Sequence, residues 1–241
     1  PLDELMRKTP ADGLVCGVGS VNADLVGEDR SRAAFISYDD TVFAGTQGMR
    51  GHHKTDRMVD LANELSLPLI FHAEGAGGRS GETDYGEGHG FGGDVRTWDK
   101  MCRLSGKVPM IGVTAGWCYA GNAAILGVTD VIIATRDALI AMGGPATIEG
   151  GGMGVFLPEE VGPISDIGPA GSVDIVVENH DEAIAMSKKE LSYSWKKLRN
   201  IPACHSSFRS QRVPPPRENL ESRGADSRLT PTEPCQSWGG S

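Results

Sequence analysis

Residues 108–154 constrain the fold more than any other part of the chain. Two apolar runs in this stretch, residues 108–113 and 128–134, have the length and composition of buried strands. Small residues separate the runs, and we expect a short helix there, from about residue 120 to residue 126. A helix that begins between two buried strands directs its first backbone N–H groups at whatever lies before it. Because glycine and alanine leave room for a ligand oxygen, the pattern predicts a site made of backbone amides, such as an oxyanion hole.

Strands and helices alternate along residues 33–193. Strands are expected at residues 33–38, 41–44, 67–71, 108–113, 131–134, 139–142 and 173–177. Helices are expected at about residues 54–65, 95–104, 120–126 and 181–193. This order is typical of an α/β domain built from connected β–α units, with glycine loops at the strand ends. We expect the helices to cover one side of the sheet.

Three segments of the chain differ in composition. Residues 1–32 are expected to form a partial N-terminal element, and residues 33–193 a single α/β domain. In residues 194–241, Ser, Pro and Arg dominate and apolar residues are sparse, so this tail is expected to be disordered. We hypothesise that the tail arises from translation out of frame or from a truncated gene.

Charge and composition argue against several classes of protein. The net charge of −9 argues against broad binding to nucleic acid. No apolar run reaches the roughly 18–20 residues that span a bilayer, so we expect no membrane insertion. The five cysteines have no paired spacing, which favours free thiols in a reducing, cytoplasmic compartment.

Four glycine-containing motifs follow one another along the chain. They are DDTVFAGTQG at residues 39–48, GAGGR at 75–79, GWCYAGNA at 116–123, and MGGP at 142–145 with EGG at 149–151. In this order they resemble the N-terminal half of the carboxyltransferase component of biotin-dependent acyl-CoA carboxylases, which are crotonase-like proteins. The resemblance covers about residues 33–193, or about two-thirds of the chain, and implies a crotonase-like ββα superhelix.

The resemblance also implies an activity, cofactors and partners. The family moves a carboxyl group from carboxybiotin to the α-carbon of an acyl-CoA, as acetyl-CoA and propionyl-CoA carboxylases do. Such ligases serve fatty acid metabolism. Biotin is then expected on a separate carrier domain or subunit, with a CoA thioester as substrate and no metal in this chain. The expected partners are acyl-CoA, the biotin carboxyl carrier and biotin carboxylase, and the family enzyme is expected to be a homo-oligomer.

The catalytic groups implied by the resemblance are backbone amides. Loss of an α-proton from a thioester produces an enolate, whose oxygen needs fixed donors. One donor is expected to be the N–H of Gly78, and the other the N–H of Gly121 or of Ala120 beside it. Many relatives carry glycine at both of the positions that Ala120 and Gly121 occupy here. Alanine still has an N–H, so the site is expected to survive this change if the φ of Ala120 stays negative. The substrate-binding residues are expected to be Gly77, Arg79, Gly116, Tyr119, Asn122, Gly143 and Gly144.

Several reactive side chains have simpler interpretations. No metal site is predicted among four residues that lack zinc-ligand spacings: His72, Glu74, Glu82 and His89. Cys118 is interpreted as a small residue that packs in the interior rather than as a nucleophile, because no histidine lies nearby in sequence to lower its pKa. Arg79 either meets an anionic group of the substrate or is an exposed loop residue. Tyr119 either lines the acyl pocket or packs against the sheet.

Two other functions remain open at this stage. A crotonase-like hydratase or isomerase needs a carboxylate over the thioester, and the candidate is Glu74 or Glu82. The other is a non-catalytic fragment that binds CoA or a partner subunit, because the family's second domain has no counterpart after Tyr193. If that domain supplies half of the site, the isolated chain is expected to be inactive.

Overall fold

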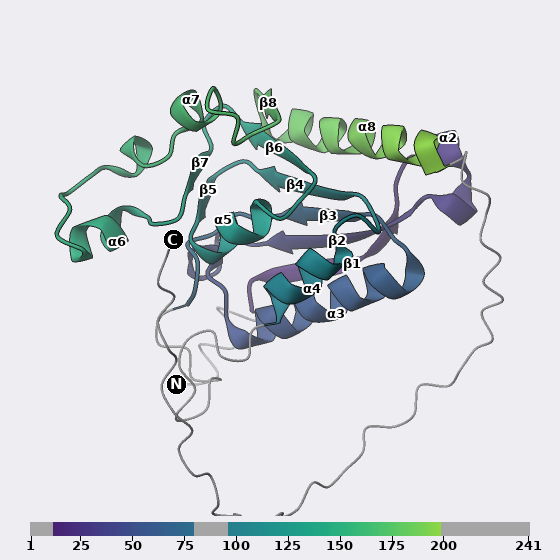
Figure 1. Ribbon diagram of the computed structural model, residues 1–241, viewed down its shortest axis with the longest axis horizontal. Coiled ribbons are helices and arrows are strands. Elements are labelled where there is room, and N and C mark those ends of the chain that lie inside the picture. The colour runs from purple at the N-terminus through teal and green to yellow at the C-terminus, as the bar shows by residue number, and fades with distance from the viewer. Residues whose placement is uncertain (1–11, 80–95, 199–241) are drawn as a thin grey trace, which may run out of the picture. The chain divides into compact units, whose positions relative to one another are not determined.

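A six-stranded sheet forms the centre of the computed structural model, which describes residues 12–79 and 96–198 (Figure 1). Along the sheet the strands are β1 (Leu14–Ser20), β2 (Arg32–Tyr38), β3 (Leu69–His72), β4 (Met110–Thr114), β6 (Val131–Thr135) and β8 (Ile175–Val177). β1 pairs with β2 in antiparallel fashion, and all the other neighbours are parallel. The predicted α/β class is therefore confirmed.

The remaining elements connect or extend this sheet. The helices are α2 (Ala23–Val26), α3 (Met49–Leu65), α4 (Thr97–Leu104), α5 (Gly121–Leu126), α6 (Pro145–Gly150), α7 (Ile164–Ile167) and α8 (His180–Leu198). A second, two-stranded parallel sheet is formed by β5 (Trp117–Tyr119) and β7 (Leu139–Ala141). Among the described residues, no helix is long and apolar enough to cross a membrane.

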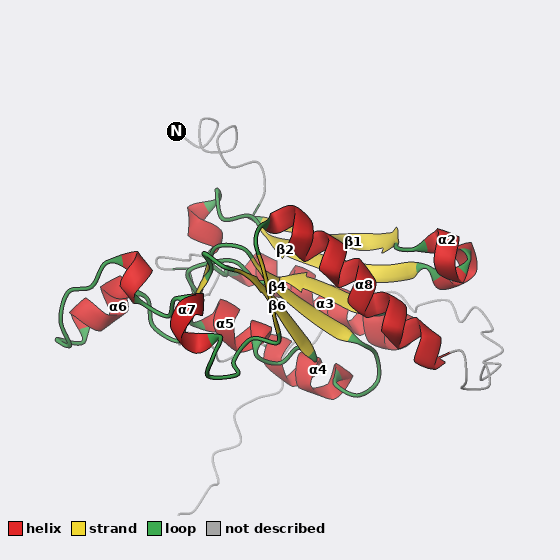
Figure 2. Cartoon of the chain, turned by 90° about the horizontal axis from the view of Figure 1, so that it is seen from above, coloured by secondary structure: helices red, strands yellow, loops and turns green. Residues whose placement is uncertain are grey.

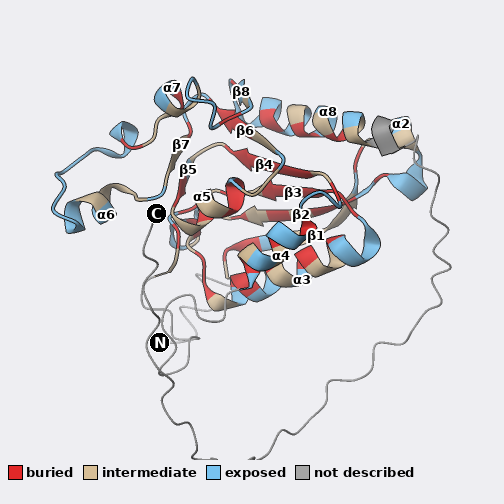
Figure 3. Cartoon of the chain, in the orientation of Figure 1, coloured by how far each residue is buried: buried red, intermediate tan, exposed pale blue. Residues whose placement is uncertain are grey.

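Helices cover both faces of the large sheet, so the expectation that they cover one side was wrong (Figure 2). Leu69 and Phe71 of β3 share a core with α3, α4 and α5, whereas Ile70 between them packs in a core with α8. The central strands β2, β3 and β4 and the inward sides of the long helices are largely buried, and the outward sides of these helices are exposed (Figure 3). Parallel strands buried on both faces are apolar throughout rather than alternating, so their sequence does not reveal the second helical layer.

Two predicted boundaries near residues 41–55 were wrong. Residues 41–44 form a turn rather than a strand, because the Asp39 carboxylate accepts hydrogen bonds from the N–H and the hydroxyl of Thr41. Phe43 and Ala44 then have positive φ angles of 50° and 54°. α3 begins at Met49, earlier than predicted, because Gly51 and His52 are buried and packing outweighs the low helix propensity of glycine.

The ends of the predicted domain differ from the observed elements. Residues 14–20 were expected to belong to a partial N-terminal element; they form β1, which pairs with β2 along its whole length. α8 continues to Leu198, beyond the predicted helix end at Tyr193. The rest of the tail, residues 199–241, lies outside the described residues, so its predicted disorder stays a prediction.

Candidate functional site

The chain beyond β3 runs alongside the small sheet. The N–H of Gly75 donates to the carbonyl of Trp117 at 2.8 Å, and the N–H of Tyr119 donates back to the carbonyl of Gly75 at 2.8 Å. These two bonds form an isolated parallel β-bridge between Gly75 and Cys118 of β5. The backbone that leads to Gly77 and Gly78 is therefore held by main-chain bonds on this side.

Gln47 holds the other side of the same loop. Its N–H donates to the carbonyl of Gly77 at 2.7 Å, and its carbonyl accepts the N–H of Arg79 at 2.9 Å. Because a trans peptide points its C=O and N–H in opposite directions, the N–H of Gly78 is turned away from Gln47. It has no hydrogen-bond acceptor within the described part of the chain. Gly78 therefore has an N–H without an acceptor among the described residues, and its role as a catalytic donor stays a prediction.

At the start of α5, the two candidate donors differ. The N–H of Ala120 donates to the carbonyl of Ala141 in β7 at 3.0 Å, so it is already engaged. The N–H of Gly121, the first residue of α5, has no acceptor among residues 12–79 and 96–198, as is usual at a helix start. The φ of Ala120 is 50° and its ψ is −119°, so the condition that its φ stay negative is not met. Of the two alternatives, the geometry favours Gly121.

The loop after β3 touches the start of α5. A Cβ atom added to Gly77 would lie 2.6 Å from the Cβ of Ala120 and 3.5 Å from the backbone nitrogen of Gly121. Only glycine fits there, since its φ is also positive, at 83°. Gly78 and Gly121 therefore lie on adjoining segments, although more than forty residues separate them in the sequence.

Asn122 joins these segments from inside the protein. It is fully buried, and its Oδ1 accepts the N–H of Gly77 at 3.0 Å. Its Nδ2 donates to the carbonyl of Glu74 at 2.9 Å and more weakly to that of Gly45 at 3.4 Å. These bonds fix the positions of the loops. They also occupy the polar atoms of Asn122, which the sequence analysis expected to bind substrate.

Gln47 is the site residue that the sequence analysis missed. Its side chain is 1% exposed, and its Oε1 lies 2.5 Å from the position that a Cβ on Gly121 would occupy. Its Nε2 has no hydrogen-bond acceptor among the described residues. Gln47 therefore contacts both segments, through its backbone at Gly77 and through its side chain at Gly121. The only signal in the sequence is its place in the first glycine motif, at residues 39–48.

Arg79 bonds to the protein itself, so it is not the exposed loop residue that one of the two interpretations assumed. Its Nη2 donates to the carbonyls of Asp12 at 2.9 Å and of Thr46 at 3.0 Å. Its guanidinium carbon lies 5.0 Å from the centre of the Phe43 ring, within cation–π range. Arg79 thus braces the loop, and its predicted contact with substrate stays a prediction.

The other predicted substrate-binding residues lie around the small sheet. Tyr119 is buried, its hydroxyl lies 3.4 Å from the carbonyl oxygens of Pro158 and Val161, and its ring packs under Gly144. This favours the packing interpretation of Tyr119. Gly116 lies at the entrance to β5, and Gly143 and Gly144 follow β7 and lead into α6.

Cys118 of β5 contacts the start of the loop that follows β3, where Glu74 also lies. The Cys118 thiol is fully buried and donates to the carbonyl of Ala73 at 2.9 Å. Burial, together with the nearby Glu74 carboxylate, raises the pKa of this thiol well above its usual range, so it is not a thiolate nucleophile at neutral pH. The Glu74 carboxylate accepts the N–H of Ala115 at 2.8 Å, and burial raises its pKa.

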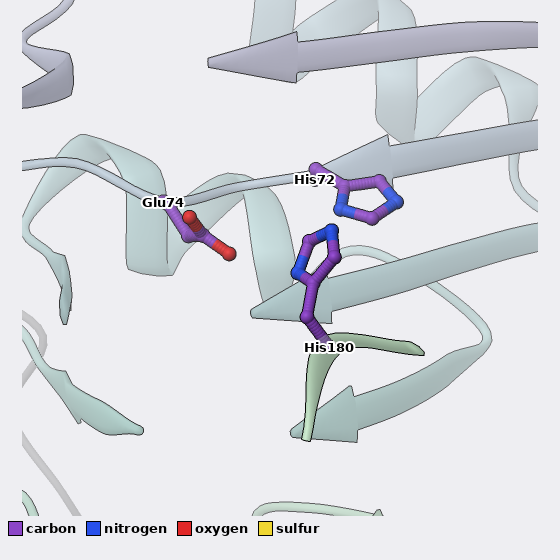
Figure 4. Close-up of side chains that lie close together, drawn as sticks. All are labelled: His72, Glu74 and His180. Atoms are coloured by element: carbon purple, nitrogen blue, oxygen red, sulfur yellow. The ribbon is translucent and has the colours of Figure 1, made fainter. Parts of the chain in front are cut away.

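Three side chains that could hold a metal ion meet next to this loop (Figure 4). His72 and Glu74 come from the end of β3, and His180 comes from the start of α8. One ligand atom from each lies within 4.8 Å of the other two. The sequence analysis could not include His180, which is far away in the chain, and two members of its discarded set, Glu82 and His89, lie outside the described residues.

Comparison with known proteins identifies relatives of this architecture. The family model described as carboxyl transferase domain matches residues 2–236. The chain is 31% identical over 186 residues to the methylmalonyl-CoA carboxyltransferase 12S subunit of Propionibacterium freudenreichii subsp. shermanii. The matched region covers 76% of this chain and 33% of that subunit.

Solved structures agree with this match. A single-chain, multi-domain long-chain acyl-CoA carboxylase has a TM-score of 0.74 and 50% identity, covering 79% of this chain and 19% of that one. The transcarboxylase 12S hexamer, solved with hydrolyzed methylmalonyl-coenzyme A bound, has a TM-score of 0.61 and 27% identity, covering 75% and 34% of the two chains. The chain spans about a third of the length of the curated relatives it matches.

Proposed function

The chain belongs to the carboxyl transferase domain family, and we propose that it is the acyl-CoA-binding part of a biotin-dependent carboxyltransferase. The proposed reaction moves a carboxyl group from carboxybiotin to the α-carbon of an acyl-CoA. One observation carries this proposal: the backbone N–H groups of Gly78 and Gly121 lie on two segments in direct contact, and neither has an acceptor among the described residues.

These two amides suit the chemistry of an enolate. Removal of the α-proton moves negative charge onto the thioester oxygen, so donors aimed at that oxygen stabilise the transition state more than the substrate. Both donors are glycines, which lets an acyl group approach the backbone closely. Loss of one such donor typically lowers the rate on the order of 10²–10³-fold. Carboxybiotin, brought by a separate carrier, supplies the carboxyl group and, on losing it, a base.

The neighbouring residues keep the two amides in place before substrate binds. Asn122 and Gln47 each bond or contact both segments, and the loop is paired with β5 on its far side. Because both N–H groups are positioned by main-chain pairing and buried amides, little reorganisation is needed when charge develops on the oxygen.

The hydratase or isomerase alternative has less support from the geometry. It needs a carboxylate over the thioester, and of its two candidates only Glu74 is described. The Glu74 side chain is bonded to the N–H of Ala115 and grouped with His72 and His180, whereas its backbone carbonyl faces Asn122. The carboxylate is therefore engaged in contacts other than those the hydratase mechanism needs.

The wider enzyme is also part of the proposal. We infer that a biotin carboxyl carrier and a biotin carboxylase act with this chain in the cytoplasm, in a homo-oligomer. The multi-domain carboxylase and the hexameric 12S core among its relatives support this inference. Three unpaired cysteines among the described residues, Cys16, Cys102 and Cys118, suit a reducing compartment. The chain spans only about a third of its relatives, so acyl-CoA binding is the part of the activity to test on it directly.

Infrared difference spectroscopy on an acyl-CoA with a ¹³C-labelled thioester carbonyl tests the proposal. We expect the chain to bind the thioester and to lower the frequency of its carbonyl stretch, because two hydrogen bonds weaken the C=O bond. In Gly77→Ala, a Cβ pressed against Ala120 separates the segments, and the shift is expected to decrease. Gly17→Ala, where a Cβ meets no atom within 4 Å, is the matched control. A bound carbonyl with the frequency it has in water would contradict the proposal, and loss of crotonyl-CoA absorbance would favour the hydratase.

A further inference from the structure

We propose that His72, Glu74 and His180 form a binding site for a divalent transition-metal ion of the zinc type. This inference does not depend on the proposed function, since it concerns three side chains that the proposed reaction does not use. It rests on three side chains from two distant parts of the sequence whose ligand atoms converge on one place.

The geometry of the cluster fits a small cation. His72 ends β3, Glu74 follows two residues later, and His180 is the first residue of α8 (Figure 4). The two imidazole rings have their centres 5.5 Å apart and are tilted by 49°. All three ligand atoms lie within 4.8 Å of one another. Ligands at about 2.0–2.1 Å around tetrahedral zinc are roughly 3.3 Å apart, so modest side-chain rotations would close the site.

The donor set indicates which metals would bind. Two imidazoles and one carboxylate are the ligands of open, exchangeable zinc sites, in which a fourth position is left for water or another ligand. Mg²⁺ and Ca²⁺ prefer oxygen ligands, so the two histidines disfavour them. His180 is exposed, which gives an ion access from solvent, whereas His72 and Glu74 are half-buried.

One ligand of the cluster is already held in position by a backbone hydrogen bond. Glu74 accepts the N–H of Ala115 through Oε1, and such an outer bond fixes a carboxylate and leaves its second oxygen for a metal.

Charges near the cluster act on a cation in opposite directions. The first residues of a helix carry partial positive charge, so the start of α8 opposes a cation at His180. Asp181 and Glu182 in the first turn of α8 offset this effect.

A bound ion would connect two layers of the fold. β3 lies in the middle of the sheet and continues into the loop that carries Gly77 and Gly78, whereas α8 covers one face. A metal shared between them would tie the start of this loop to α8. Because binding to the folded state alone stabilises it, the ion is expected to raise the unfolding temperature.

Cobalt binding to the full chain, first dialysed against a chelator, tests the proposal. Co²⁺ reports a site of two imidazoles and a carboxylate through visible d–d absorption, and zinc is then expected to displace it. The wild-type chain is expected to bind one equivalent. Because loss of even an outer partner of a metal ligand costs about 10–100-fold in affinity, His180→Ala and Glu74→Gln are expected to weaken binding at least about tenfold. Glu74→Gln keeps an oxygen for the N–H of Ala115, so it preserves the fold.

His53→Ala provides the matched control, because His53 is an exposed histidine on α3 outside the cluster. It is expected to bind cobalt as the wild type does, and zinc is expected to raise the unfolding temperature of both but not of His180→Ala. The double variant His180→Ala with Glu74→Gln measures any metal held elsewhere in the chain. Absence of cobalt binding by the wild type, or equal affinity in the wild type and both single variants, would overturn the proposal.

Discussion

The carboxamide oxygen of Asn122 accepts the backbone N–H of Gly77 at 3.0 Å, across 45 residues of sequence. The nitrogen of the same side chain donates to the carbonyl of Glu74. A single buried amide thus joins the loop after β3 to the start of α5, the two segments that carry the proposed catalytic N–H groups. Since both bonds are made inside the protein, the side chain has its donors and its acceptor engaged before any ligand arrives.

Asn122→Asp is expected to destabilise the fold with almost no change in shape. The aspartate keeps an acceptor for Gly77 but loses the donor to Glu74, and it places a buried negative charge against a carbonyl oxygen. An unsatisfied buried polar group costs about 1–3 kcal/mol, and more if it is charged. Urea unfolding measures the loss, and Asn63→Asp, at an exposed position on α3, is the control. Equal stability of the two variants would refute the bridging role of Asn122.

Ala120→Gly is expected to stabilise the protein. Ala120 has φ 50° and ψ −119°, a conformation that costs a residue with a side chain about 1–3 kcal/mol and costs glycine little. Some of this gain is lost with the methyl group, so we expect a net gain of about 1 kcal/mol. In the matched variant Ala124→Gly, inside α5, glycine instead costs about 1 kcal/mol. If both variants lose stability equally in urea unfolding, Ala120 is not strained.

Gly75→Ala is expected to disrupt the site and the fold. Gly75 has a φ of 147°, and a Cβ there would overlap the carbonyl oxygen of Gly45 and approach Nδ2 of Asn122 to 2.5 Å. Overpacking against a backbone atom, added to an unfavourable φ, is expected to cost about 3 kcal/mol or more. Gly17→Ala is the control, because it meets open space in β1. Thermal unfolding compares the two, and a small loss at Gly75 would show that the segments at residues 45 and 75 separate easily.

His52 is expected to make the protein less stable in mild acid. It is buried, and its Nδ1 lies 3.1 Å from the Thr97 hydroxyl, whose hydrogen is donated to Asp56 at 2.6 Å. Nδ1 must therefore carry the proton in this bond. Burial lowers the pKa of His52 below its usual value of 6.5. As the pH falls through 6.5, the unfolded chain binds a proton that the folded chain does not, so stability present above this pH is lost.

The His52→Asn variant tests this pH dependence. Asparagine keeps a donor for Thr97 but does not titrate, so its free energy of unfolding is expected to decrease less between about pH 7.5 and about pH 5.5. Urea unfolding at the two pH values gives the comparison. The same decrease in the variant and in the wild type would show that other groups cause the acid sensitivity.

Cys118 is expected to resist alkylation in the native protein. Its thiol is fully buried and bonded to the carbonyl of Ala73, and burial raises its pKa. Cys102 on α4 is exposed and is expected to react readily. Iodoacetamide labelling followed by peptide mass analysis distinguishes the two, and both thiols should react in denaturant. Native labelling of Cys118 at the rate of Cys102 would reopen the nucleophile interpretation.

The sequence predicted the class of fold and the family because both depend on local features. Apolar runs of strand length marked β3, β4 and β6, and the four glycine motifs in order led to the family that the comparisons confirm. The same motifs contained Gly78 and Gly121. These two glycines could be recognised from the sequence alone. A backbone that another group approaches closely requires glycine, whichever group that is.

Some residues of the site could not be assigned in this way. Gln47 stood in a recognised motif, but its burial and its contact with Gly121 depend on how α3 and α5 pack. His180 was ordinary in the sequence, and only the position of α8 on the sheet brings it to His72 and Glu74. Neither residue carries a local pattern that distinguishes it from a solvated polar residue.

The sequence by itself determined an α/β chain of this family with glycine-lined loops between buried strands. Only the tertiary structure decided that, among the described residues, Gly121 rather than Ala120 has an amide without an acceptor, because the N–H of Ala120 is bonded to Ala141 on a neighbouring strand. It also decided that helices cover both faces of the sheet. The physical reason is the same in both cases: a hydrogen bond or a packing surface between distant segments depends on the partner, and short-range patterns carry no information about it.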